Sequence, residues 1–458
     1  MSTTDRQEQK FIEMTTTPVN RLIARLAAPT IICMLTSSIY NMADTFFVGQ
    51  INTQSTAAVG ISFSVMAVIQ AIGFFFGHGS GNYISRKLGS KEMDNAETMA
   101  STGFAAAFLI GVVLAVFGYI FSAPLAVILG STPTVLPYAV DYLRIIFIGA
   151  PFIMSSFVIN NQLRFQGKAA SSMIGVMSGG IINIGLDPLF IFKFEMGVAG
   201  AALATIISQF IGFVILLVIN QTKGTIKFAL GNIKFNMYYL KEIARGGFPS
   251  LCRQGLGAIS TILLNHSAGL YGDAAIAGMS IVTRIMMFAG SVMIGFGQGF
   301  QPVCGYNYGA KLYSRVRKGY WFCVQVAFVF LTVIAIIMGI NATWMVEIFR
   351  KGDPEVTKTG ITALRLQCIS LPLSAFIVTG NMMLQSIGKA TKASIVAMAR
   401  QGIFLIPALL ILPKAFGLLG VQMSQAISDV LAAALTIPIT LSVIKEMKEA
   451  EKAALKQV

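Results

Sequence analysis

The sequence predicts an all-α polytopic membrane protein. We expect twelve transmembrane helices in two parallel six-helix repeats, an N-lobe and a C-lobe, around a central cleft. Of the 458 residues, 55% are hydrophobic and only 12% are charged, whereas a soluble domain is about a quarter charged. Many apolar blocks approach or exceed about 20 residues, long enough to cross a hydrocarbon core as helices. Motifs of the first half also return in the second half at a near-constant offset.

Twelve apolar blocks, separated by charged or turn residues, define the expected spans. They cover 23–47, 57–81, 98–120, 136–160, 170–192, 197–220, 246–270, 275–299, 320–342, 361–386, 393–412 and 418–442. The expected organisation is a cytoplasmic N-terminal tail (1–20), the N-lobe with helices 1–6 (21–220), a cytoplasmic connector (221–245), the C-lobe with helices 7–12 (246–442) and a cytoplasmic C-terminal tail (443–458). The segment 1–20 is polar and lacks the apolar stretch of a signal peptide, so a tail is expected there.

The distribution of Lys and Arg predicts the orientation of the spans. If the N-terminus lies inside, the inside segments hold 25 of the 34 basic residues, Arg400 among them, and the outside segments hold five. Because basic residues are retained on the cytoplasmic side, we expect both termini in the cytoplasm and a multi-pass protein of the bacterial cytoplasmic (inner) membrane. The net charge of +15 reflects this topology, and we expect no nucleic-acid partner.

The two halves repeat each other at a near-constant offset along the chain. Turns and a span asparagine recur in pairs: Gly89-Ser90-Lys91 and Gly309-Ala310-Lys311, Asn160 and Asn381, and Gly167-Lys168-Ala169 and Gly388-Lys389-Ala390. Six spans per copy is an even number, so both copies share one orientation and an axis along the membrane normal should relate them. Parallel repeats around a cleft suit alternating access.

A carboxylate in the first span is a functional candidate, because charges inside a span are costly. Asp44 shares one helical face with Ser37, Tyr40 and Asn41. Lipid would not tolerate this supporting polar face, so we expect it to point into the bundle. The alternative is that Asp44 packs or caps near the outer interface.

A second carboxylate lies in the fifth span. Asp187 follows Asn183 by one turn and directly precedes Pro188. Pro188 has no amide hydrogen, so it frees the carbonyl of Ile184 and should bend the helix. These hard oxygens could hold a monovalent cation, or the buried carboxylate could take up a proton. A packing role near the end of the span is the alternative.

The duplication does not extend to these carboxylates. At the offset that relates Gly89 to Gly309, the counterparts of Asp44 and Asp187 are Leu264 and Pro407. An architectural role would be expected in both copies, so the asymmetry predicts one coupling site, in the N-terminal half. The charged residues that we place inside spans of the second half are mainly basic, with one late carboxylate: Arg253, Arg284, Arg400 and Asp429.

Other polar residues within the spans have weaker functional interpretations. Arg284 and Arg253 are candidates for the substrate cleft, where they could orient anionic groups; snorkelling or binding to backbone carbonyls is the alternative. His78 and His266 are interpreted as structural. The five cysteines have no metal-ligand spacing and are interpreted as small buried side chains.

Several segments together resemble the multidrug and toxic compound extrusion (MATE) family over about residues 18–445. They are NMADTFFVGQ (41–50), ISRKLGSK (84–91), NIGLDPLFIF (183–192), GVAGAALATIISQ (197–209) and GFQPVCGYNYGAK (299–311). The resemblance implies a cation-coupling site, or Na⁺ site, in the N-lobe at Asp44, Asn183, Asp187 and Thr205. Some family members instead use acidic residues in spans 7 and 10, and this sequence has none at 246–270 or 361–386. We therefore expect no C-lobe cation site.

The resemblance implies a secondary active antiporter. We expect it to export small amphipathic, cationic organic compounds in exchange for H⁺ or Na⁺, with no cofactor beyond the coupling ion. Its partners would be small-molecule substrates and the lipid bilayer, and we expect a monomer. The sequence does not choose between H⁺ and Na⁺.

Two other functions have less support. A lipid-linked glycan flippase of the same wider superfamily would need a cleft rich in Arg and Lys, whereas only Arg253 and Arg284 lie well within the spans. A membrane-embedded enzyme is not favoured, because the chain has two His, no metal-ligand cluster and no nucleophile–base pair. We expect no enzymatic activity.

Overall fold

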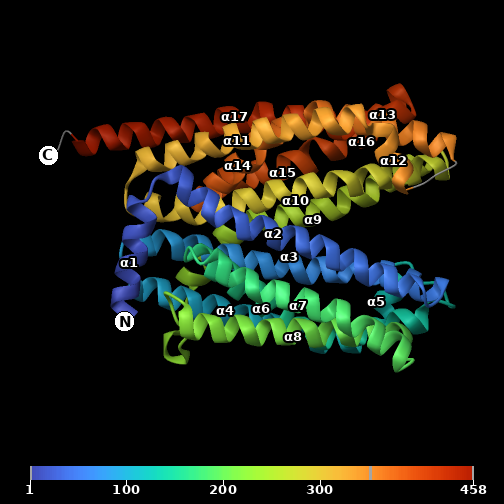
Figure 1. Ribbon diagram of the computed structural model, residues 1–458, viewed down its shortest axis with the longest axis horizontal. Helices are drawn as coiled ribbons and strands as arrows, with labels where there is room; N and C mark the ends of the chain where they lie inside the picture. Colours follow the sequence, from blue (N-terminus) through green and yellow to red (C-terminus); the bar gives the residue numbers. More distant parts are fainter. Residues whose placement is uncertain (1–2, 350–352, 456–458) are drawn as a thin grey trace.

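The protein is an elongated bundle of long helices (Figure 1). The computed structural model describes residues 3–349 and 353–455, with their side chains except at positions 3, 4, 6, 41, 45, 53 and 455. Within these residues all regular secondary structure is helical. Both chain ends lie at the same end of the bundle, on the left in Figure 1. We call this the terminal end and the opposite one the far end.

The N-lobe contains six long helical segments. They are α2 (Val19–Gly49), α3 (Thr53–Gly89), α4 (Met93–Ile120), α6 (Leu136–Phe165), α7 (Ala169–Pro188) with its π-helical continuation η1 (Leu189–Lys193), and α8 (Gly197–Lys223). Three short elements accompany them: α1 (Thr3–Thr16), α5 (Ser122–Ile128) and the 3-10 turn η2 (Leu230–Asn232). Helix α1 lies across the terminal end, roughly perpendicular to the bundle (Figure 1).

The C-lobe repeats this organisation. Its long segments are α9 (Met237–Gly269), α10 (Asp273–Gly309), α11 (Tyr313–Ile340), α13 (Pro354–Ser370) continuing through η3 (Leu371–Leu373) into α14 (Ser374–Ser386), α15 (Ala390–Met398) continuing through the π-helix η4 (Ala399–Ile403) into α16 (Leu405–Phe416), and α17 (Leu418–Leu455). Helix α12 (Ala342–Phe349) is short.

The predicted fold class is confirmed. Among the described residues, eleven segments are long and apolar enough to cross a membrane. The twelfth long helix, α9, has 33 residues but is more polar, with Lys241, Glu242 and Arg245 near its start. Helices also extend past the predicted spans: α9 begins inside the predicted connector, and α17 runs through the expected C-terminal tail to Leu455. Backbone hydrogen bonding continues a helix beyond its apolar section, so apolar blocks underestimate helix length.

The two copies contact each other reciprocally. A Cβ on Gly89 would lie 2.1 Å from the carbonyl oxygen of Tyr306, and one on Gly309 would lie 2.0 Å from that of Arg86. These two contacts are related by the offset of the internal repeat. Correspondingly, α2 packs on α10 and α3 packs on α9. Such reciprocity is characteristic of a two-fold relation, so the duplication found in the sequence is also present in the packing.

The lobes meet mainly in the half of the bundle near the terminal end. There, a Cβ on Gly79 would come within 2.3 Å of the Ile243 carbonyl oxygen, and one on Gly247 within 2.1 Å of that of Phe75. Only glycine allows the backbones of α3 and α9 to approach this closely.

Toward the far end the facing helices are exposed. Ser38 on α2 and Ser291 on α10 are joined by a 3.2 Å hydrogen bond. One turn further out on the same helical faces, Met42 is 52% exposed and Met287 is 55% exposed. In Figure 1 the two lobes lean apart in this direction. The lobes are therefore in contact near the terminal end and separate toward the far end, where the predicted cleft would open.

Packing inside the N-lobe gives a test of the fold. A Cβ on Gly111 of α4 would lie 2.5 Å from Cα of Pro151 on α6. We expect Gly111→Val to destabilise the protein by about 1–3 kcal/mol, because backbone must move to admit the side chain. A Cβ on Gly60 meets no atom within 4 Å, so Gly60→Val is the control. Thermal unfolding in detergent measures both, and equal shifts would contradict the helix contact.

Candidate functional site

The first part of the site is a polar pair on α7. Asp187 is fully buried and Asn183 is 3% exposed. Asn183 Nδ2 donates a 3.2 Å hydrogen bond to Asp187 Oδ1, as expected for residues one turn apart on one helical face. The carboxamide holds one carboxylate oxygen and leaves the other for a further ligand.

Asp44 and Tyr40 approach this pair from α2. The Tyr40 ring faces Gly180 of α7, where a Cβ would be 3.4 Å from the ring. The Asp44 carboxylate lies close enough to Asp187 to interact with it electrostatically. The predicted polar face of the first span thus points into the N-lobe. Ser37 on this face is half-buried and makes polar interactions, while the side chain of Asn41 lies outside the described part of the molecule.

Thr205 and Tyr142 line the same space from α8 and α6. Thr205 is 7% exposed, and its hydroxyl donates a 3.0 Å bond to the Ala201 carbonyl. The Tyr142 hydroxyl lies near the Thr205 side chain and close enough to both carboxylates to interact with them electrostatically. Sequence analysis missed Tyr142. Its counterpart in the second copy is Ala363, one position before the Leu364 that matches Leu143, so the asymmetry that singled out the carboxylates could have identified it.

Several oxygens of this cluster lack a hydrogen-bond donor. Asp44 Oδ1, Asn183 Oδ1 and Asp187 Oδ2 are buried and have no partner among the side chains and backbone that the structure describes. Nor does any basic side chain form an ion pair with either carboxylate in this part of the chain. Unsatisfied buried oxygens are energetically unfavourable. The cluster is therefore suited to receive a positive charge, as a proton or a monovalent cation.

The backbone changes geometry directly after Asp187. Pro188 is the last residue of α7, and the Phe194 amide then bonds to the Leu189 carbonyl in a 3.0 Å π-helical bond. π-Helical turns of this kind are frequent at functional sites. Asp187 therefore lies at the junction of an α-helical and a π-helical segment.

The C-lobe also contains a buried carboxylate, but this one is neutralised. Asp429 on α17 is 1% exposed, and Arg400 Nε donates to its Oδ1 at 2.8 Å. Ser370 and Gln425 donate further bonds to it. Arg400 lies in η4, inside a candidate membrane span, so counting it in an inside segment is wrong and placing it within a span is correct. Its side chain is half-buried and pairs with Asp429, a contact that the sequence did not indicate.

A series of hydrogen-bonded side chains joins the lobes at the inner end of the predicted cleft, which we call the cleft floor. His78 on α3 accepts from Arg164 Nη2 through Nε2 at 3.0 Å, so its Nδ1 carries the proton and donates to Ser250 on α9 at 2.9 Å. Gln385 on α14 donates to the same hydroxyl at 2.8 Å. His78 therefore connects the two lobes. Its structural interpretation is consistent with this position, although the sequence did not indicate the inter-lobe contact.

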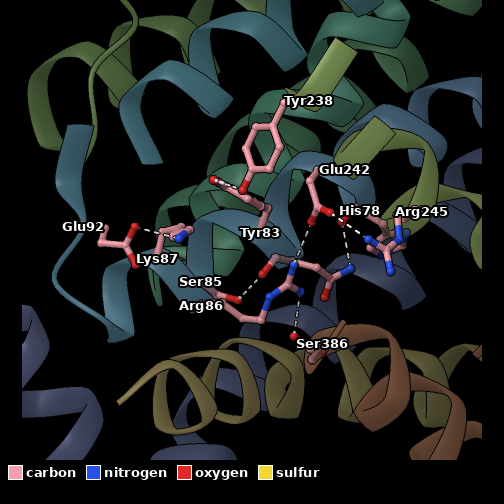
Figure 2. Close-up of polar contacts among 11 residues, drawn as sticks. His78, Tyr83, Ser85, Arg86, Lys87, Glu92, Tyr238, Glu242, Arg245 and Ser386 are labelled. Carbon is pink, nitrogen blue, oxygen red and sulfur yellow. Dashed lines mark hydrogen bonds and ion pairs between the residues drawn. The ribbon is translucent and has the colours of Figure 1, made fainter. Parts of the chain in front are cut away.

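Arg86 joins the lobes closer to the terminal end. Figure 2 shows it on α3 between Glu242 of α9 and Ser386 of α14. Its guanidinium lies 3.6 Å from the Glu242 carboxylate and donates a 3.0 Å bond to the Ser386 carbonyl. Arg245 pairs with Glu242 from the same helix at 3.2 Å. Arg86 is thus held by two C-lobe helices.

The two arginines proposed for the substrate cleft lie in different places. Arg253 is half-buried near the floor, where its Nη1 donates to Asn381 Oδ1 at 3.1 Å. Arg284 is exposed on α10, two turns outward from Ser291 on the same helical face. The structure thus places Arg253 in a contact between two C-lobe helices, α9 and α14, and leaves Arg284 exposed on α10. Among the described residues, neither arginine forms an ion pair with the N-lobe carboxylates.

Comparison with known proteins identifies the family. The MatE family model matches residues 29–189 and 249–410. The two matches cover one copy of the internal repeat each. The multidrug export protein MepA of Staphylococcus haemolyticus (strain JCSC1435) is 30% identical over 442 residues, covering 96% of each chain. The chain belongs to the MATE family. It is therefore a multi-pass membrane transporter and not an enzyme.

Further MATE relatives agree in sequence and in structure. MepA of Staphylococcus aureus (strain NCTC 8325 / PS 47) is 31% identical over 424 residues, covering 91% of this chain and 92% of the relative. An outward-facing multidrug resistance MATE transporter of the MOP superfamily has a TM-score of 0.90 at 25% identity, covering 96% of this chain and 98% of its own. A MATE protein in the bent conformation gives the same values. These relatives do not favour the flippase alternative.

The two buried carboxylates should respond differently to neutralisation. Asp429→Asn leaves Arg400 without its counter-charge, and breaking a buried ion pair costs about 3–5 kcal/mol. Asp187→Asn removes a charge that has no basic partner among the described residues, so it should leave stability unchanged or raised. Thermal unfolding of the purified proteins in detergent distinguishes the two. Equal destabilisation by both variants would contradict the assigned pairing.

The Arg86 contact predicts a charge-reversal effect. Arg86→Glu places two carboxylates opposite each other between the lobes, so we expect more molecules with separated lobes at the terminal end. The measurement is the distance distribution between spin labels at Ser90 and Lys318. Adding Glu242→Arg should restore much of the short distance.

The matched control for this reversal is Arg245→Glu, which changes a charge on the helix of Glu242 without crossing the lobe interface. It should leave the distances unchanged. The interpretation fails if the Arg245 variant matches Arg86→Glu, or if the double variant shows no recovery.

Proposed function

We propose that this MATE protein is a secondary active antiporter that exports small amphipathic, cationic organic compounds in exchange for H⁺ or Na⁺ by alternating access. The observation that carries the proposal is the pair Asp44 and Asp187 inside one lobe of a duplicated bundle. Each has a buried carboxylate oxygen with no hydrogen-bond partner among the described residues. The relatives named multidrug export protein MepA support drug export as the transported process.

The terminal end is proposed to face the cytoplasm. The excess of Lys and Arg in segments at this end supports that orientation. The cleft, which opens to the far end, would then face the outside, consistent with the likeness to an outward-facing MATE transporter. No second chain is needed to complete the carboxylate cluster, so we propose that the monomer is the working unit.

The coupling cation would bind between α2 and α7. Asp44, Asn183, Asp187 and Thr205 present the oxygens, and the Tyr142 hydroxyl adds another on the α6 side. Two negative charges near each other in a buried site repel, so the arrival of one positive charge stabilises the site and lets the helices approach. A proton on one carboxylate and a Na⁺ shared by several oxygens both satisfy this requirement.

Helix α2 couples this site to the cleft. One face carries Asp44 toward α7, while Met42 and Phe46 lie exposed on the face that continues from the Ser38 contact. A shift of α2 on cation binding would therefore move the cleft wall as well. Methionine and phenylalanine offer a polarizable surface for apolar cations. Cation uptake in the outward-open state would displace substrate, and substrate binding would oppose cation uptake.

Transport by reconstituted protein tests the carboxylates. Proteoliposomes loaded with a fluorescent organic cation are given a pH gradient or a Na⁺ gradient separately. The gradient that drives export identifies the coupling ion. We expect Asp44→Asn and Asp187→Asn each to reduce gradient-driven export at least tenfold. Asparagine has no negative charge for the coupling cation to neutralise.

The matched control is Asp141→Asn, which removes an exposed carboxylate from α6 outside the cluster. It should retain wild-type export. Undiminished export by Asp44→Asn, in protein that unfolds at the wild-type temperature, would refute the coupling site. Export that ignores both gradients would refute antiport.

A further inference from the structure

A basic pocket lies at the terminal end of the N-lobe, away from the cleft. Its volume is about 360 Å³. It is open to the surface and is lined by residues of α1, the start of α2, the turn between α6 and α7, the first turn of α7 and the end of α8. In Figure 1 this is the region where α1 crosses the ends of the N-lobe helices. The pocket is therefore at the level where the spans leave the membrane.

The turn between α6 and α7 brings α1 against the pocket. Gly167 has a φ of +76°, which favours glycine. A Cβ there would come within 2.7 Å of Lys10 Cε and 2.9 Å of Met14 Sδ. Helix α1 is also bound to the other lobe, since Asn307 donates to the Met14 carbonyl at 3.1 Å. The pocket is thus held by tertiary contacts on both sides.

The lining of the pocket is strongly positive. Among the described residues, the charged side chains that line it are four basic ones and one acidic one: Lys10, Arg25, Lys168, Lys223 and Glu13. Lys10 binds Glu13 at 2.8 Å, and Arg25 pairs with the same carboxylate. Burial raises the pKa of Glu13, but the hydrogen bonds and charges of Lys10 and Arg25 outweigh burial and hold that pKa below its ordinary value. Glu13 is therefore ionised at neutral pH, and the lining keeps a net excess of three positive charges.

The internal repeat offers a comparison. At the equivalent turn of the C-lobe, Lys389 and Lys392 bind Glu446 of α17 at 2.9 and 2.8 Å. The paired motifs of the two copies are 220 or 221 residues apart. The positions of the first copy that match Glu446 are therefore Ile226 or Thr225, and neither is acidic. The second copy thus carries its own anion at this place, whereas the first copy adds a further cation, Lys223, at the end of α8.

We propose that this pocket binds a phosphate group, on the headgroup of an anionic phospholipid or on a small soluble phosphate. Lys and Arg with donors on several sides match a phosphate with its several acceptor oxygens. Basic pockets between helix ends at the membrane surface are suited to lipid headgroups. Ala169, Ala170 and Ser171 of the first turn of α7 also line the pocket, and the amides of a first helical turn have no acceptor within the helix. This site is separate from the proposed transport site and does not depend on it.

Lipid binding to the full-length protein tests the proposal. Native mass spectrometry in detergent compares retention of phosphatidylglycerol and phosphatidylcholine, and calorimetry measures inorganic phosphate. We expect retention of phosphatidylglycerol over phosphatidylcholine. Lys168→Gln with Lys223→Gln should weaken phosphatidylglycerol binding on the order of tenfold, because each cation near the surface contributes to anion affinity.

The matched control is Lys389→Gln with Lys392→Gln, which removes the same charge from the equivalent turn of the C-lobe. It should bind phosphatidylglycerol within about twofold of wild type. If only inorganic phosphate binds with the same lysine dependence, the site takes a soluble phosphate. Equal losses in both double variants, or equal retention of the two lipids together with no phosphate binding, would overturn the proposal. Should the first double variant fail to fold, Lys223→Gln alone, at an exposed side chain, serves instead.

Discussion

The close approach of α3 to α9 and α10 is the contact on which the arrangement of the lobes depends. Glycines at 79, 89, 247 and 309 let backbones touch where any side chain would separate them. Polar links through His78 and Arg86 form over the same surface. Because this contact is confined to one half of the bundle, the lobes close at the terminal end and leave a cleft at the far end. Access to the cleft from one side follows from where the glycines lie.

The two lobes share a scaffold and differ in how they treat buried charge. In the C-lobe, Asp429 is compensated by Arg400 within the chain, and the pair is a structural element. In the N-lobe, Asp44 and Asp187 lie near each other with oxygens that lack donors in the described structure. A low-dielectric interior makes such a site unfavourable unless a cation completes it. That difference is the physical basis for our proposal that the coupling chemistry lies in one lobe only.

Much of this protein could be predicted from sequence, because membrane spans leave strong signals. Hydrocarbon thickness determines the length of an apolar block, and the repeated glycine turns at 89 and 309 identify the duplication. The polar faces carrying Asp44 and Asp187 were recognisable for the same reason: a charge in a span needs a partner. Tyr142 was missed because the two copies were compared only at their charged residues, although its counterpart Ala363 differs in the same way.

Composition and spacing were sufficient to predict the helical class and the two copies of the repeat. They also predicted which half of the chain carries carboxylates without a basic partner. The bilayer constrains these features directly. Other features became visible only in the packed molecule. Arg400 pairs with the buried Asp429, His78 and Arg86 join the lobes, and Arg253 and Arg284 lie in separate regions. Each depends on contacts between residues distant along the chain. A single sequence carries no spacing rule for such contacts, because their geometry is set by how whole helices cross.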